Sequence, residues 1–137
     1  MKYDYFVSSR WRNKDQIQEL TEKLRARNKT VYSFLEGKAA GKYSGQNAEE
    51  FMKKFEKKDW QKDLYVKAVF NEDLDGLKNS KSFILLLPAG NSCHLEAGIA
   101  FALNKKCILI GEAEKAESLY LIFKENYKDI NSFLKVL

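Results

Sequence analysis

Hydrophobic and polar positions follow a strand-and-helix pattern, which is clearest in the second half of the chain. Lys81–Leu87 is a near-continuous apolar run, typical of a parallel strand buried on both faces. A glycine-bearing turn follows it, and the Ala-rich segment after the turn predicts a helix over Ser92–Asn104. Cys107–Gly111 is a second apolar run of strand length. This stretch therefore predicts a strand, a helix and another strand in succession.

The same alternation extends over the first half of the chain. Tyr3–Ser9 is β-rich, and Lys14–Arg27 has apolar residues at helical spacing with basic residues in its last turn. The remaining predicted elements are a strand (Thr30–Leu35), a loop (Glu36–Gln46), a helix (Asn47–Trp60), a helix (Asp63–Asn79) and a terminal amphipathic stretch (Asp129–Leu137). Alternation of this kind predicts one α/β domain over residues 1–137. We expect a flavodoxin-like or Rossmann-like three-layer sandwich whose parallel sheet has four or five strands.

Composition and charge narrow the classes of partner. The chain is 45% hydrophobic, which suits one well-formed core, and 24 basic against 19 acidic residues give a net charge of +5. Much of the excess is lysine that alternates with Glu and Asp, which favours a solvated helix face over a nucleic-acid groove. A modest positive field would instead attract a phosphorylated small molecule.

Other classes of protein are excluded by what the sequence lacks. It has no run of eighteen apolar residues, so no membrane span is predicted, and its N-terminus has no signal-peptide layout. Cys93 and Cys107 lie in separate apolar elements without metal-ligand spacing. No P-loop, zinc site or Ser-His-Asp triad is apparent. We therefore expect a reduced, cytoplasmic protein without metal or cofactor.

One acid, Glu96, stands in the opening turns of the predicted helix after the glycine turn. The helix opens at Gly90-Asn91-Ser92, and Asn91 or Ser92 is expected to cap it, which leaves further backbone N–H groups for an anion. The helix dipole is expected to hold Glu96 ionised, as a nucleophilic carboxylate must be. The alternative is a surface carboxylate that merely complements the dipole, and the residues alone leave both interpretations open.

A second acid, Asp73, lies late in the helix before the buried strand. Ligands of parallel sheets bind at the carboxyl ends of the strands, where the strand order switches. This rule brings the loop after the first strand, Asp73 and the turn before Glu96 around one cleft. If Asp73 faces Glu96, one carboxylate can attack while the other handles a proton or a sugar hydroxyl. An acid on a solvated helix face is the alternative, and Glu72 and Asp75 are neighbouring acids of the same kind.

The loop after the first strand carries residue types that bind nucleotides. Aromatic rings stack on bases, hydroxyls hold ribose or phosphate, and arginine grips phosphate in a fork. The alternative is a cationic surface loop with its first tyrosine in the core. His94, the only histidine, precedes Glu96 by two positions and is expected to play a structural or solvent-facing role. The candidate binding residues here are Tyr5, Ser8, Ser9, Arg10 and Arg12.

At this point the residues resemble a known family. Leu87–Ala100, which includes the Glu96-Ala-Gly triplet, resembles the signature of the nucleoside 2-deoxyribosyltransferase-like superfamily. Asp73–Ser80 resembles the Asp-Leu segment that leads into a strand in that family. Tyr5–Arg10 is similar to the first-strand loop of its 2′-deoxynucleoside 5′-phosphate N-hydrolase branch. The chain departs from the pattern at Lys81, where the family has an acid.

The resemblance implies a flavodoxin-like fold and cleavage of the N-glycosidic bond of a nucleoside or nucleoside 5′-monophosphate, by hydrolysis or by deoxyribosyl transfer. Glu96 would attack the anomeric carbon to form a glycosyl-enzyme, and Asp73 would act at the base or orient the nucleophile. The resemblance also implies a homo-oligomer, a dimer or larger. The residues that would bind the substrate are Tyr5 beside the base, and Gly90, Asn91, Ser92 with Arg10 or Arg12 at a 5′-phosphate.

Two other functions remain open on the sequence. A TIR-like NAD hydrolase shares the fold layout and a catalytic Glu on a helix. A non-catalytic nucleotide-binding or signalling module would use the same nucleotide site without turnover. Residues 36–62 match nothing in the family, and we expect them to form a lid or a surface for protein interaction.

Overall fold

The computed structural model describes residues 1–38 and 59–137, and at its centre is a five-stranded sheet in which every strand pairing is parallel. The strand order is β2-β1-β3-β4-β5. This confirms the predicted α/β fold, and the order of the strands is flavodoxin-like. The strands are β1 (Tyr3–Ser8), β2 (Val31–Ser33), β3 (Ser80–Leu86), β4 (Lys106–Ile110) and β5 (Glu125–Tyr127).

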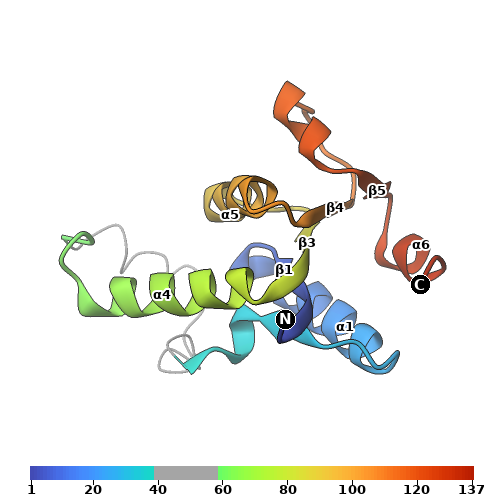
Figure 1. The fold of residues 1–137 in the computed structure, drawn as a ribbon. Coiled ribbons are helices and arrows are strands. Elements are labelled where there is room, and N and C mark those ends of the chain that lie inside the picture. The colour runs from blue at the N-terminus through green and yellow to red at the C-terminus, as the bar shows by residue number, and fades with distance from the viewer. Residues whose placement is uncertain (39–58) are drawn as a thin grey trace.

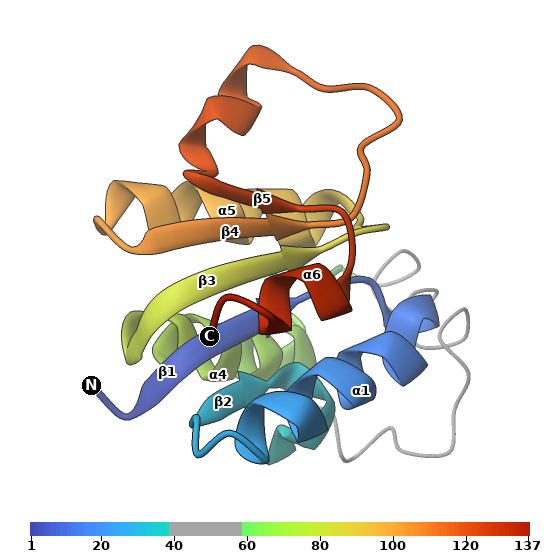
Figure 2. The ribbon, with the colours of Figure 1, turned by 90° about the vertical axis from the view of Figure 1, so that its right-hand side faces the viewer.

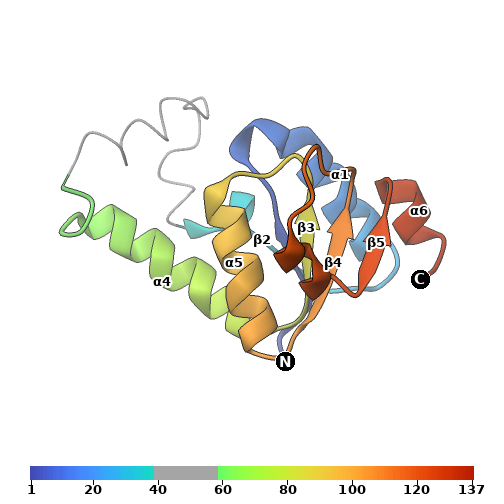
Figure 3. The same ribbon diagram turned by 90° about the horizontal axis from the view of Figure 1, so that it is seen from above.

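Helices cover both faces of the sheet. Helices α1 and α6 lie on one face, while α4 and α5 lie on the other, so the molecule has three layers (Figure 1 and Figure 3). A short 3-10 helix, η3, lies beyond the β5 edge of the sheet (Figure 2). The helices are α1 (Lys14–Arg25), α4 (Leu64–Lys78), α5 (Asn91–Ala102) and α6 (Ile130–Leu134), with the 3-10 helices η1 (Trp11–Asn13), η2 (Phe34–Glu36) and η3 (Ser118–Ile122).

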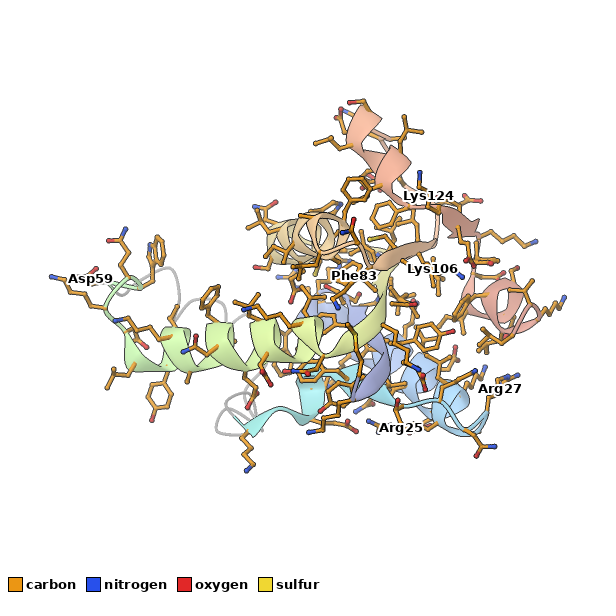
Figure 4. All side chains as sticks on the ribbon, viewed as in Figure 1. Arg25, Arg27, Asp59, Phe83, Lys106 and Lys124 are labelled. Carbon is orange, nitrogen blue, oxygen red and sulfur yellow. The ribbon has the colours of Figure 1, made fainter. Side chains whose placement is uncertain are left out.

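Strand β3 shows why the sequence builds two apolar layers. Alternate side chains of a strand point to opposite faces of the sheet. Phe83 and Leu85 pack against α4 and α5, and Figure 4 labels Phe83 in that layer. Ile84 and Leu86 pack against α1 and α6 on the other face. All four are at most 2% exposed, as the continuous apolar run predicts.

The ends of several elements differ from the prediction. The first helix ends at Arg25 rather than Arg27, and β2 spans only Val31–Ser33 because the chain turns into η2 at Phe34. The predicted helix over residues 47–60 lies almost wholly outside the described residues, as does most of the loop before it. The described part begins again at residue 59 and forms a turn before Asp63, whose side chain caps α4.

A buried lysine links three elements by hydrogen bonds at the amino end of the sheet. Lys105 lies just before β4, and its Nζ donates hydrogen bonds to the carbonyl of Ser80 at 2.6 Å and to that of Lys78 at 3.0 Å. It thereby joins the start of β4 to the start of β3 and the end of α4. Burial lowers the pKa of Lys105.

Across residues 1–38 and 59–137, no helix has both the length and the apolar character that a bilayer crossing demands.

Candidate active site

The loops after β1 and β3 meet at the carboxyl end of the sheet. Strands β1 and β3 are neighbours in the sheet. The chain runs from β1 to β2 on one side and from β3 to β4 on the other, so the strand order switches between β1 and β3. Ser9 is buried here, and its hydroxyl donates to the carbonyl of Pro88 at 3.2 Å. Asn13 donates in turn to the Ser9 hydroxyl at 3.0 Å. Ser9 therefore ties the two loops together and holds the neighbouring Ser8 in place.

Glu96 projects from the second turn of α5 toward this junction. Ser8 donates its hydroxyl hydrogen to Glu96 Oε1 at 2.7 Å, a bond between residues 88 positions apart in sequence. Glu96 is thus turned toward the sheet and partly buried, which excludes the interpretation of a surface carboxylate that only complements the dipole.

Burial sets the protonation of Glu96. It raises the pKa of Glu96 to about 7, because desolvation outweighs the hydrogen bond from Ser8, and the nearby Asp73 raises it further. The expectation that the helix end holds Glu96 firmly ionised is therefore wrong. Helix-dipole effects fade beyond the first turn, and Glu96 stands six residues beyond the N-cap.

The N-cap of α5 is Gly90 rather than Asn91 or Ser92, and no side chain caps the helix. The predicted cap is wrong because Asn91 and Ser92 already lie within the first helical turn. All three residues are exposed. The first backbone N–H groups of a helix have no intrahelical partner, so this end can still receive an anion.

Asp73 lies on the face of α4 that turns toward the sheet. Tyr32 of β2 donates its hydroxyl hydrogen to Asp73 Oδ1 at 2.8 Å. Burial raises the pKa of Asp73 to about 6, while the Tyr32 hydrogen bond lowers it and Glu72 raises it. Since the charge of Asp73 also raises the pKa of Glu96, the two carboxylates interact electrostatically.

Tyr32 is a site residue that the sequence reasoning missed. Its ring stacks on Phe6 with a centroid distance of 5.0 Å and an interplanar angle of 9°. A side chain at Gly76 would meet this ring, because an added Cβ would lie 2.5 Å from a ring carbon. A tyrosine in a short strand gives no sign of a polar partner 41 residues away, so no local signal could have identified it.

The other predicted binding residues of the first-strand segment lie on the opposite face of the sheet or on the exposed loop after β1. Tyr5 points to the opposite face of the sheet, where its ring packs edge-on against Phe133 with a centroid distance of 6.0 Å. Arg10 and Arg12 are exposed on the loop and 3-10 helix that follow β1. The structure therefore gathers Ser8, Asp73 and Glu96 and leaves Tyr5 on the other side.

His94 and Cys93 support the start of α5. His94 Nδ1 donates to the Gly90 carbonyl at 2.8 Å, so in the neutral ring Nε2 accepts the Tyr120 hydroxyl at 2.8 Å. Cys93 is buried, and desolvation raises the pKa of its thiol, so it is no activated nucleophile. Within the described ranges, no three His, Cys, Asp or Glu side chains are grouped as a metal would require.

Two solved structures are similar to the chain over nearly its whole length. A 2-deoxyribosyltransferase from Bacillus psychrosaccharolyticus is 14% identical with a TM-score of 0.66, over 95% of this chain and 89% of that protein. The CMP N-glycosidase BcmB from Clostridium botulinum is 19% identical with a TM-score of 0.54, over 96% of each chain. At these identities the likeness establishes a shared fold. No family model and no curated protein matches the sequence.

Proposed function

We propose that this chain cleaves the N-glycosidic bond of a nucleoside or nucleoside 5′-monophosphate, with Glu96 as nucleophile and Asp73 as its acid–base partner. One observation carries the proposal. Two partly buried carboxylates, each bonded to a hydroxyl from a neighbouring strand, interact at the strand-order switch of a fold shared with a deoxyribosyltransferase and a CMP N-glycosidase.

The protonation of the pair suits a two-step reaction. With pKa values of about 6 and about 7, Asp73 and Glu96 hold roughly one proton between them at slightly acidic pH, and that proton lies mainly on Glu96. The productive form is the minor one, in which Glu96 is ionised and Asp73 carries the proton. Glu96 attacks the anomeric carbon, the bond from that carbon to the base nitrogen breaks, and the nitrogen takes the bond's electron pair and the Asp73 proton.

Water completes the cycle. It attacks the same carbon of the glycosyl-enzyme, its proton passes to the Asp73 carboxylate, and the Glu96 carboxylate leaves. Two displacements at one carbon retain its configuration. Hydrolysis is proposed over transfer because the cationic loop suits a phosphorylated substrate rather than a second neutral base.

A 5′-phosphate would bind at the start of α5. The exposed N–H groups of Asn91 and Ser92 donate to it, and Arg10 or Arg12 on the adjoining loop supplies charge. Tyr5 has no part in this proposal, because its ring packs on the far face of the sheet.

The test is a chromatographic assay for free base. The panel comprises ribo- and deoxyribonucleosides, their 5′-monophosphates and NAD. Base release by the wild type, lost in Glu96→Gln and kept in the matched variant Glu114→Gln, is the expected result, since Glu114 is an exposed loop carboxylate. Full activity of Glu96→Gln overturns the proposal. Nicotinamide release alone indicates an NAD hydrolase, and a nucleotide-induced thermal shift without any product indicates a binding module.

The assembly is a further part of the proposal. We expect a homo-oligomer, a dimer or larger, in which η3 contributes to the contact, because Leu119 and Leu121 are 76% and 81% exposed. Sedimentation of the wild type and of a Leu119→Ser/Leu121→Ser variant tests this, and a monomeric wild type contradicts it. The cytoplasmic location stays a prediction.

A further inference from the structure

Tyr32 is held on three sides, which fixes the position of its hydroxyl. One ring face stacks on Phe6, Tyr3 approaches edge-on at a centroid distance of 5.5 Å, and the backbone of Gly76 lies close to the ring edge. The side chain is only 9% exposed. The hydroxyl of a tyrosine lies on the axis of its ring, so immobilising the ring also immobilises the hydroxyl.

Helix α4 meets this tyrosine with two residues on one face. Gly76 and Asp73 are three residues apart, which places them on adjacent turns of the same side. Gly76 admits the ring because it has no Cβ, and Asp73 meets the hydroxyl at 2.8 Å. Both elements therefore contribute to the contact: α4 provides the space for the ring and the acceptor for the hydroxyl, and β2 provides the tyrosine.

We propose that Tyr32 is a positioning residue of this site, whose hydroxyl holds the Asp73 carboxylate in one orientation. The inference rests on the proposed function and deepens it. A tyrosine hydroxyl that donates to a carboxylate favours the charged acid. It opposes burial and the charge of Glu72 on α4, which both raise the pKa of Asp73. The charge of Asp73 in turn raises the pKa of Glu96 on α5.

The decisive variant is Tyr32→Phe, which keeps the stacked ring and removes only the hydroxyl. Titration of the Asp73 carboxyl carbon by NMR should show its midpoint rise by roughly one pH unit. The matched control is Tyr127→Phe, because the Tyr127 hydroxyl also donates to a carboxylate, that of Glu125 at 2.6 Å, on the far edge strand. The control should leave the Asp73 midpoint where it is in the wild type. An unchanged Asp73 midpoint in Tyr32→Phe overturns the inference.

Kinetics test the same idea in the reaction. The pH profile of kcat/KM for base release should move to higher pH in Tyr32→Phe. The proposed first step needs Asp73 protonated, so a higher Asp73 midpoint moves the alkaline limb of the profile to higher pH. A merely structural role would lower the rate at every pH without moving the profile, and that result overturns the inference.

A double-mutant cycle guards against a folding defect. In an Asp73→Asn background, Tyr32→Phe should change kcat/KM less than twofold, because the residue acts through Asp73. A full additional loss in that background contradicts the inference. Failure of the wild type to release any base refutes the proposed function instead, and the Asp73 titration then still decides whether Tyr32 controls that carboxyl.

Discussion

Replacing Glu96 by glutamine should stabilise the protein far more at alkaline than at acidic pH. The pKa of Glu96 is about 7 in the folded protein, against an ordinary value of 4.5. As the pH rises above 4.5, the unfolded chain loses this proton while the folded chain keeps it, so stability falls until the folded group also ionises near pH 7. Glutamine has no such proton and escapes the loss.

The magnitude follows from the two pKa values. Their difference, at about 1.36 kcal/mol per pKa unit, corresponds to about 3 kcal/mol. This is a large part of the roughly 5–15 kcal/mol that separates folded from unfolded domains. The stability difference between Glu96→Gln and the wild type should therefore grow by about 3 kcal/mol between about pH 4 and about pH 8.

Urea denaturation at both pH values measures this difference, with linear extrapolation to water. Any fixed cost of the amide cancels, because only the change with pH is compared. Glu114→Gln, a substitution of an exposed loop carboxylate, is the control. A pH-dependent change below about 1 kcal/mol for Glu96→Gln would refute the claim that burial controls this carboxyl.

Three further substitutions test the contacts around the site and the core. Ser8→Ala removes the hydrogen bond that lowers the pKa of Glu96, so the acidic limb of kcat/KM for base release should move to higher pH, and a uniform loss at all pH values contradicts this. Lys105→Met keeps the apolar stem but leaves two carbonyls without their donor, so urea unfolding should show a free energy of unfolding lower by about 2 kcal/mol. An unchanged free energy of unfolding contradicts the role of the ammonium group. Gly76→Ala forces a methyl group against the Tyr32 ring, so thermal unfolding should show destabilisation by about 1–3 kcal/mol, and an unchanged melting temperature contradicts the close contact.

The sequence predicts the segment from β3 to β4 well because each element carries its own signal. A run buried on both faces needs apolar residues throughout, and an Ala-rich helix packs closely on it, as Ala97 and Ala100 do. The short edge strand β5 is different. Glu125 and Asn126 interrupt its hydrophobic pattern, and only pairing with β4 makes this segment a strand. The sequence pattern allows for a fifth strand but does not locate it in the chain.

The site is predictable in part for the same reason. Glu96 stands out because a carboxylate is unusual on a helix that faces a core, and strand order places it near the loop after β1. Its protonation could not be predicted, because desolvation depends on how completely neighbouring elements cover it. The bond between Tyr32 and Asp73 depends on the approach of β2 to α4, which is a property of the assembled layers.

Lys105 and Glu96 are held near opposite ends of β3. Lys105 bonds to the carbonyl of Ser80 at the start of β3, and Glu96 bonds to Ser8, which pairs with Leu85 near the end of β3. Five residues at about 3.3 Å per residue separate these levels by roughly 16 Å. Substitutions so far apart combine almost independently in free energy. Substitutions that stabilise the amino end of the sheet could therefore offset the stability lost by burying Glu96. They would do so without moving the side chains of the site.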